Sequence, residues 1–240
     1  MKGKKVEYQH RDQVFEAQVF FPARAEASSF LVFVFHTWRG RDAFACAQAE
    51  RLATLGYSGV ALDLYGQGVL GTSVEESSAL MQPLVDDRSL LQARMLVSID
   101  AVRNALGASD HPYAAIGFCF GGLCVLDLAR SGASVQGVVS FHGLLHPPKK
   151  TSGSQVKAKI LVLHGRDDPM VDRKEVVAFE REMTDLKADW QLHTYGNTLH
   201  GFTDPAADDL KLGVMYNPLS ARRAYETMAS FLREVFARFQ

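Results

Sequence analysis

The sequence has little of several features that would place it in a specialised class. Its 240 residues include three cysteines, and 26 basic against 27 acidic residues leave a formal net charge of −1. A sparse, odd set of cysteines does not form the disulfide framework of a small secreted protein. Without a basic excess, nucleic acid is not an expected partner, because nucleic-acid binders collect phosphates with clustered lysine and arginine.

Long apolar runs are also missing. No run approaches the ~18 residues that cross a bilayer, so no membrane association is expected. The first ten residues, Met1–His10, are charged and lack the apolar centre of a signal peptide. The acidic group Asp204, Asp208 and Asp209 has no histidine or cysteine at ligand spacing, so no metal site is predicted. We therefore expect a cytoplasmic protein with reduced thiols.

The sequence does contain a regular alternation of apolar runs and helical segments. Runs such as Phe30–Phe35 (FLVFVF) suit strands that are covered on both faces of a parallel sheet. Strands are predicted at Val14–Phe21, Phe30–Phe35, Ser58–Leu62, Ala114–Phe118, Gly137–Phe141, Ile160–Leu163 and Trp190–Tyr195. Helices are predicted at Phe44–Leu55, Ser73–Val85, Asp87–Leu106, Phe120–Ser131, Arg173–Thr184 and Leu219–Phe239.

This order of elements predicts an α/β fold with a mostly parallel central sheet and helices on both faces. The Ser/Gly loop Thr151–Ser154 is too short to separate two domains, so residues 1–240 are predicted to form a single domain. Loops at the carboxyl ends of parallel strands line the active crevice in such folds. Candidate catalytic residues are therefore sought in those loops.

The sharpest local motif is GFCFGG at residues 117–122, between a predicted strand and a predicted helix. This is the context of a G-x-S-x-G nucleophile elbow, with Cys119 in the serine position. The turn is tight, so the residues two before and two after the nucleophile must be small, as Gly117 and Gly121 are. The amide of Phe120 at the helix N-terminus can donate to a developing oxyanion. The alternative is a buried structural cysteine on a glycine-rich packing turn.

The other two cysteines have no such context. Cys46 and Cys124 lie inside predicted helices and are expected to be inert core residues. A redox pair of Cys119 and Cys124 is disfavoured, because a helical spacing of five turns the side chains about 140° apart.

A catalytic thiol needs a base, and His200 is the best candidate because it lies in a loop just after a predicted strand. Asp167 and Asp168 follow another predicted strand, and either carboxylate can hold the imidazole tautomer. Nucleophile, acid and histidine then occur in the order of α/β-hydrolases. The alternatives are a solvated pair of aspartates in a turn and a surface histidine.

A second oxyanion donor is expected in the loop after Phe30–Phe35, at the amide of Trp38. His36 in the same loop is a rival base that we expect to pack the loop instead. His142 can line the pocket rim or serve packing alone. His164 is expected to satisfy backbone groups.

Together the motifs resemble the dienelactone hydrolase family. The hexapeptide around Cys119 looks like that family's cysteine elbow, the segment Asp168–Val171 looks like its catalytic-acid segment, and Leu199-His200-Gly-Phe looks like its histidine loop. The resemblance spans nearly the whole chain and favours Asp168 over Asp167. It implies an eight-stranded α/β-hydrolase fold, a Cys119–His200–Asp168 triad, oxyanion donors at the amides of Trp38 and Phe120, and no cofactor.

Two positions depart from the family pattern. Thr37 stands where the best-studied members carry a glutamate that helps to activate the thiol, and Thr203-Asp204 stands where they carry an arginine for the substrate carboxylate. Arg88 resembles a second carboxylate-binding arginine, although its acidic neighbours favour an exposed ion pair. Arg88 and Thr37 are therefore candidate substrate-binding positions.

We predict a hydrolase that cleaves a small ester or lactone through a cysteinyl thioester. The protein is expected to act as a monomer or homodimer, with a small molecule as its partner. The alternative is a catalytically weak or inactive scaffold that binds a small molecule on the same fold.

Overall fold

Strand β5 (Tyr113–Phe118) contains the division of the chain into two units, Met1–Ala115 and Ile116–Gln240. The computed structural model describes residues 3–23, 30–149 and 155–239, and the loop Thr151–Ser154 lies outside them. The grouping of residues 1–240 into one domain stays a prediction. Within the described ranges, no helix has the length and hydropathy that crossing a bilayer requires.

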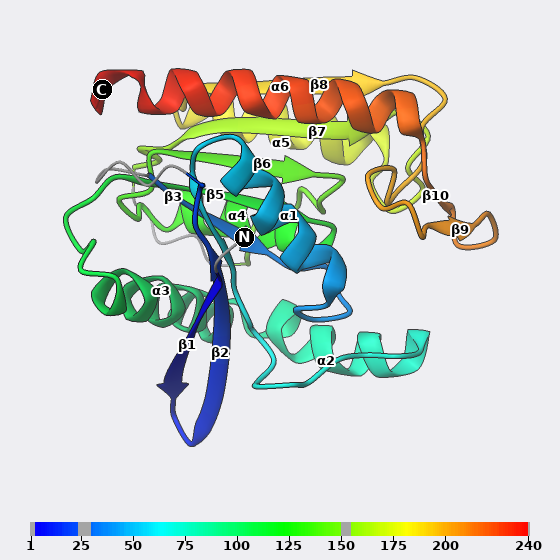
Figure 1. The fold of residues 1–240 in the computed structure, drawn as a ribbon. Helices are drawn as coiled ribbons and strands as arrows, with labels where there is room; N and C mark the ends of the chain where they lie inside the picture. Colours follow the sequence, from blue (N-terminus) through cyan, green and yellow to red (C-terminus); the bar gives the residue numbers. More distant parts are fainter. Residues whose placement is uncertain (1–2, 24–29, 150–154, 240) are drawn as a thin grey trace. The chain divides into compact units, whose positions relative to one another are not determined.

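The first unit contains four further strands, which are paired with one another. They are β1 (Gly3–His10), β2 (Gln13–Phe20), β3 (Leu31–Phe35) and β4 (Ser58–Ala61). β1 and β2 form an antiparallel hairpin (Figure 1), β2 is antiparallel to β4, and β3 is parallel to β4. The order of these four strands is therefore β1-β2-β4-β3.

β1 was not predicted from the sequence. Only Val6 and Tyr8 of its eight residues are buried, so its apolar signal is weak. The hairpin turns at Arg11 with φ 57°, without the Asn-Gly or Asp-Gly pair that marks such a turn in a sequence. Pairing with β2 forms this strand.

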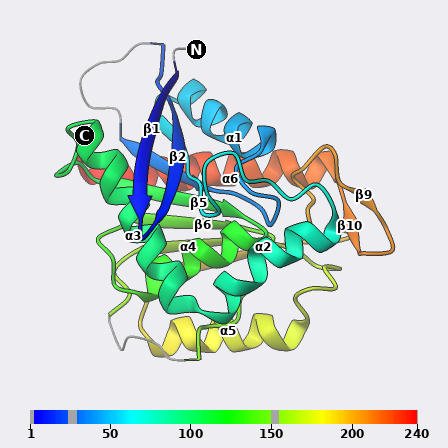
Figure 2. The ribbon, with the colours of Figure 1, turned by 90° about the horizontal axis from the view of Figure 1, so that it is seen from below.

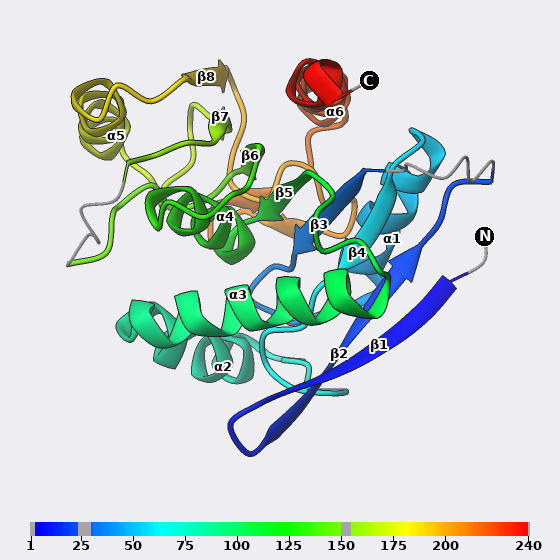
Figure 3. The same cartoon turned by 90° about the vertical axis from the view of Figure 1, so that its left-hand side faces the viewer.

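Three helices belong to the first unit. They are α1 (Ala43–Thr54), α2 (Val74–Asp86) and α3 (Arg88–Ala105). Their N-termini are capped by the side chains of Asp42, Ser73 and Asp87, each of which accepts a backbone N–H in the first turn. α1 and α3 lie on opposite sides of the first-unit strands (Figures 2 and 3). Gly59 permits the close approach of α1, because a Cβ there would lie 2.0 Å from the carbonyl oxygen of Ala49.

The second unit is built on three parallel strands. They are β6 (Gly137–Phe141), β7 (Lys159–Gly165) and β8 (Trp190–Tyr195), paired in that order. The helices are α4 (Phe120–Arg130), α5 (Arg173–Asp185) and α6 (Pro218–Phe236), with a 3₁₀ turn at Ala237–Phe239. α4 and α5 lie on one side of the strands and α6 lies on the other (Figures 2 and 3). Every residue of α4 is buried.

Two very short strands, β9 (Asp208–Asp209) and β10 (Val214–Met215), form a hairpin between β8 and α6 (Figure 1). The Asp209 carboxylate accepts the amides of Lys211 and Leu212 and so fixes the turn. Strands of two residues carry no periodic signal, and the sequence did not predict them. Each of the predicted strands and helices is present, most with ends within one or two residues of the prediction.

Candidate active site

Cys119 lies between the end of β5 and the start of α4, in the turn that the sequence predicted to be strained. Its backbone has φ 56° and ψ −114°, a conformation that residues with a side chain rarely adopt. A Cβ on Gly117 would lie 1.9 Å from the carbonyl oxygen of Gly121. The expected closeness of residues 117 and 121 is therefore confirmed, and glycine at position 117 is what permits it.

The three cysteines differ in their surroundings, and all are free thiols. Cys119 is partly exposed, whereas Cys124 is fully buried in α4, as predicted. The core position expected for Cys46 is wrong, because this residue is partly exposed and its sulfur lies 3.6 Å from Gln18 Oε1 and 3.8 Å from Arg41 Nη1. Burial nevertheless raises the pKa of the Cys46 thiol, which disfavours its thiolate.

His200 and Asp168 form a buried pair. His200 Nδ1 lies 2.8 Å from Asp168 Oδ2, and the side chains are 4% and 0% exposed. Asp168 Oδ1 accepts the amide of Met170 at 2.9 Å, which fixes the orientation of the carboxylate. Asp167 is exposed, so the geometry selects Asp168 as the acid that faces the imidazole.

The Cys119 sulfur acts electrostatically on His200. Burial lowers the pKa of the imidazole, but attraction to the Cys119 sulfur and bonding to Asp168 outweigh burial and raise it to about 10. Nε2 of His200 makes no hydrogen bond of normal geometry among the described residues. The structure thus brings together Cys119, His200 and Asp168, with Nδ1 of the imidazole bonded to the acid and the Cys119 sulfur acting on the same ring.

The β9–β10 hairpin holds the backbone of His200. The amide of His200 donates to the Gly213 carbonyl at 3.1 Å, and the amide of Met215 donates to the His200 carbonyl at 3.0 Å. A Cβ on Gly213 (φ 69°) would lie 2.2 Å from Pro169 Cγ, so the same hairpin packs on the loop that carries Asp168. Sequence reasoning missed this support, for which Gly213 was the only local signal.

Two further histidines lie near His200. His142 is buried, and its Nε2 lies 2.8 Å from Thr203 Oγ1. Burial and the charge of His200 hold the pKa of His142 well below its ordinary value. Burial also lowers the pKa of His164, whose Nδ1 has no hydrogen-bond partner among the described residues, and the expectation that its ring satisfies backbone groups stays a prediction.

The predicted second oxyanion donor lies in the first unit. Trp38 presents its carbonyl to the Tyr65 hydroxyl at 3.0 Å, and Thr37 Oγ1 accepts the amide of Arg39 at 3.3 Å. His36 packs this loop as expected, because its Nδ1 donates to the Thr37 carbonyl at 2.6 Å and its Nε2 accepts the amide of Leu64 at 3.2 Å. With both ring nitrogens bonded to backbone, His36 is no rival base.

The roles of Trp38, Thr37 and Arg88, all in the first unit, stay predictions. Arg88 is the first residue of α3. Phe120 is the first residue of α4, directly after Cys119, and its expected role as an oxyanion donor also stays a prediction.

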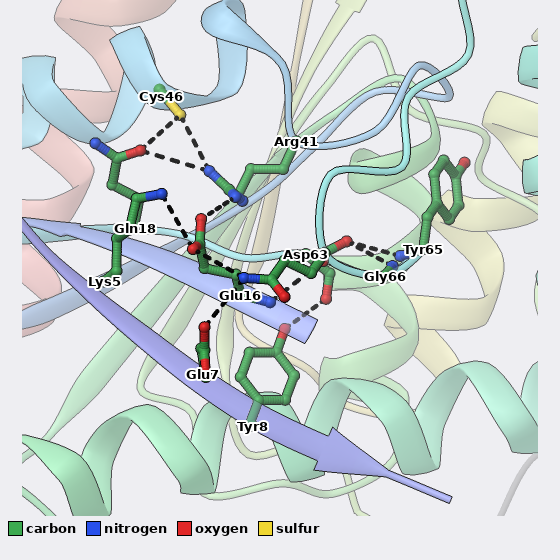
Figure 4. A network of polar contacts seen from close by, with 11 residues as sticks. Lys5, Glu7, Tyr8, Glu16, Gln18, Arg41, Cys46, Asp63, Tyr65 and Gly66 are labelled. Atoms are coloured by element: carbon green, nitrogen blue, oxygen red, sulfur yellow. Dashed lines mark hydrogen bonds and ion pairs between the residues drawn. The ribbon is translucent and has the colours of Figure 1, made fainter. Parts of the chain in front are cut away.

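A separate polar cluster lies within the first unit (Figure 4). The Asp63 carboxylate accepts the amides of Tyr65 and Gly66 on one oxygen and the amide of Glu16 on the other. Glu16 in turn lies 2.6 Å from Arg41 Nη2 and 3.1 Å from Lys5 Nζ. We refer to these residues together as the Asp63 cluster: Lys5, Glu16, Arg41, Asp63, Tyr65 and Gly66. Its acceptors are matched by donors, which is the arrangement of a structural support.

The acidic residues near the hairpin serve turns. Asp204 accepts the amide of Ala206 at 2.9 Å, and Asp209 caps the β9–β10 turn. No group of three or more histidine, cysteine, aspartate or glutamate side chains within residues 3–23, 30–149 and 155–239 is arranged to hold a metal ion.

A strained strand-to-helix turn followed in sequence by a buried acid–histidine pair is the arrangement typical of an α/β-hydrolase. The chain is similar to the solved structure called m3DLH, with 35% sequence identity over 98% of each chain and a TM-score of 0.90. The dienelactone hydrolase-like promiscuous phosphotriesterase P91 from metagenomic libraries is 32% identical, again over 98% of each chain and with a TM-score of 0.90.

Sequence comparison narrows the class to one family. The model of the dienelactone hydrolase family matches residues 15–236. The uncharacterized protein K02A2.1 of Caenorhabditis elegans is 33% identical over 155 residues, which is 63% of this chain and 98% of that protein. The chain belongs to the dienelactone hydrolase family, and it has the α/β-hydrolase fold with a mostly parallel central sheet.

Proposed function

We propose that this protein is a hydrolase that cleaves small esters or lactones with Cys119 as nucleophile, His200 as base and Asp168 as the acid that orients the base. The observation that carries the proposal is geometric: Nδ1 of the buried His200 lies 2.8 Å from Asp168 Oδ2, and Cys119 lies in the strained turn between β5 and α4. Attraction to the Cys119 sulfur and bonding to Asp168 raise the pKa of His200, which suits this imidazole to take the proton of the thiol.

The reaction follows in two halves. His200 takes the proton of Cys119, the thiolate attacks the carbonyl carbon, and the resulting oxyanion is held by the amides of Phe120 and Trp38. A good donor of this kind stabilises the oxyanion by about 3 kcal/mol. The C–O bond of the ester then breaks, and the leaving alkoxide receives the proton from His200. Water, deprotonated by His200, attacks the thioester and releases the acid and the Cys119 thiol.

Asp168 supports both halves by orienting the base. Its carboxylate holds Nδ1–H of His200, so that Nε2 is the nitrogen that exchanges the proton. Since nucleophile, base and acid all come from the chain, the proposed reaction needs no cofactor. Thr37 leaves no carboxylate at the activating position seen in the best-studied relatives, so the imidazolium itself is proposed to sustain the thiolate.

Arg88 and Thr37 are proposed to contact the substrate. An arginine there offers two parallel N–H donors, which suit the carboxylate of a charged ester or lactone. The protein is further proposed to act in the cytoplasm, as a monomer or homodimer.

Phosphotriesters are a second substrate class, favoured by one observation. A relative that is 32% identical over nearly its whole length is named as a promiscuous phosphotriesterase. A thiolate that attacks a carbonyl carbon can also attack a phosphorus centre, provided that a donor holds the developing charge on its oxygen. A non-catalytic binding scaffold on the same fold is the other alternative.

A panel of p-nitrophenyl esters, lactones, thioesters and a phosphotriester tests these classes. The wild type is expected to hydrolyse esters or lactones fastest, while Cys119→Ala loses the activity and Cys119→Ser retains a small fraction of it. Cys124→Ala and Cys46→Ala are the matched controls, because they remove a thiol elsewhere. A generic ester cleaved by Cys119→Ala at the wild-type rate contradicts the proposal. Failure of iodoacetamide to alkylate Cys119 in the folded protein favours the binding scaffold.

A further inference from the structure

The end of β6 contacts each of the three segments that carry the proposed triad. The carbonyl of Phe141 accepts the amide of Cys119 at 3.0 Å. The next amide, of His142, donates to the Leu163 carbonyl at 2.9 Å, near the end of β7 and before the loop that carries Asp168. Phe141 and His142 therefore hold the turn of Cys119 in a fixed position relative to the end of β7, which leads into the loop of Asp168.

The side chain of His142 reaches the third segment. Its Nε2 lies 2.8 Å from Thr203 Oγ1, and its ring lies edge-on to the rings of His200 and Phe202, with centroids 5.0 and 5.3 Å away. Residues 200–203 thus surround the His142 ring with an imidazole, a phenyl ring and a hydroxyl. The packing restricts rotation of the His200 ring on this side.

The backbone of His142 is held in a costly conformation. Its φ is 38°, and the residue is 2% exposed. Such strain, worth about 1–3 kcal/mol, persists only where the surrounding contacts specify it, and it gathers at functional sites. An ordinary packing residue at the end of a buried strand would not need it.

We propose that His142 is the positioning residue that sets His200 against Cys119, by joining the histidine loop to the strand end that also binds the nucleophile elbow. The inference rests on the proposed function and assigns no chemical step to His142. Thr203, three residues after His200, is its partner in this role.

The charges around His142 agree with the role. The titratable groups that face this part of the site are Cys119, Asp168, His164 and His200, from four different segments. Burial keeps His142 neutral, so it does not repel the His200 imidazolium that forms when the sulfur gives up its proton. A charged ring at 5.0 Å would oppose that proton transfer.

The test compares His142→Phe, which keeps a ring and loses the hydrogen bond, with Thr203→Val, which loses only the hydroxyl. Both variants are expected to lower kcat by about 10- to 100-fold with KM nearly unchanged, because small misplacement of a catalytic group has effects of that order. The pH dependence of Cys119 alkylation by iodoacetamide is expected to shift in both. Thr203→Ser, which keeps the hydroxyl, is expected to restore the wild-type kcat and the wild-type alkylation curve.

Thr198→Val is the matched control. Thr198 is also a buried threonine near His200, but its hydroxyl donates to the Gly196 carbonyl and contacts Ser220 instead of His142. It is expected to lower the unfolding free energy without moving kcat or the alkylation curve. The double variant His142→Phe with Thr203→Val is expected to match His142→Phe alone, since both remove one interaction.

Wild-type kcat and a wild-type alkylation curve in Thr203→Val would overturn the inference, as would an effect of equal size in Thr198→Val. Failure of the proposed function has a different signature. In that case Cys119→Ala hydrolyses substrate like the wild type, whereas the alkylation measurements need no hydrolysis and still report on the contact between His142 and His200.

Discussion

The Asp63 cluster in the first unit and the histidine site in the second unit both bury ionisable groups, but they satisfy them differently. Each oxygen of the Asp63 carboxylate accepts backbone amides, and Glu16 is paired with Arg41 and Lys5. In the second unit, Nε2 of His200 has no hydrogen bond within the described residues. A carboxylate whose two oxygens both accept hydrogen bonds stabilises a loop, whereas a ring nitrogen without a hydrogen bond of normal geometry keeps the capacity to exchange a proton.

Backbone strain follows the same division. Cys119 and His142, both in the second unit, hold positive φ values of 56° and 38° while largely or partly buried. The residues of the Asp63 cluster have no positive φ except at Gly66, where glycine adopts it at little cost. Buried polar side chains therefore do not by themselves identify a catalytic site. Buried side chains with an unbonded polar atom, next to residues with a strained backbone, identify it more selectively.

The largest effect is expected in the histidine site of the second unit, when Asp168 loses its charge. Asp168→Asn is expected to lower kcat by about 10³- to 10⁴-fold, because an amide no longer stabilises the imidazolium or selects its tautomer. The pKa of His200 should fall in the same variant, since bonding to Asp168 is among the causes that raise it. Steady-state kinetics and a histidine NMR titration measure the two effects. Asp167→Asn is the control, and an equal loss of kcat there would remove Asp168 from the triad.

An intermediate effect is expected from the same substitution in the first unit. Asp63→Asn places an NH₂ group against one of the amides that the carboxylate now accepts, so the unfolding free energy is expected to fall by about 1–3 kcal/mol. Because the cluster serves structure, kcat should stay within about twofold of the wild type at temperatures where the variant is folded. Urea unfolding and ester hydrolysis measure the pair. If Asp63→Asn lowered kcat without lowering the unfolding free energy, the Asp63 cluster would not have the purely structural role that separates it from the histidine site.

The smallest expected effect is on acid stability. Burial lowers the pKa of His142 and of His36 below 6.5, so the unfolded chain binds protons more readily than the folded chain as the pH falls below that value. Unfolding free energy should therefore decline below about pH 6.5, by up to ~1.4 kcal/mol per pH unit for each such group. The raised pKa of His200 acts in the opposite direction between about pH 7.5 and 6.5, where the folded chain already holds this proton and the unfolded chain still takes it up, so the decline is measured below about pH 6.

Urea unfolding at pH 6.0 and pH 5.0 measures the decline in acid. Thr203→Val, which leaves both imidazoles in place, should show the same change between the two pH values as the wild type. A stability that rises on acidification would mean that His142 and His36 bind protons more readily in the folded chain than in the unfolded chain, which contradicts the lowered pKa of both rings.

Much of the fold was predictable because its signals are local. Buried strands such as β3 are continuous apolar runs, and helices such as α1 begin at a capping aspartate. β1 was missed because its strand character depends on pairing with β2, and β9 and β10 were missed because two residues show no period. Cys46 was misplaced because helical periodicity does not reveal that its helix face meets Gln18 and Arg41 at a partly exposed site.

The elbow at Cys119 could be recognised from the sequence, since glycine at position 117 is a steric requirement set by residues that are near it in the chain. The sequence also determined the order of nucleophile, acid and histidine. Only the tertiary structure decided that Asp168 and not Asp167 faces the imidazole, because two adjacent aspartates have the same chemistry and differ only in burial. Only the tertiary structure placed His142 against Thr203, 61 residues away, because packing between distant segments leaves no periodic trace in the chain.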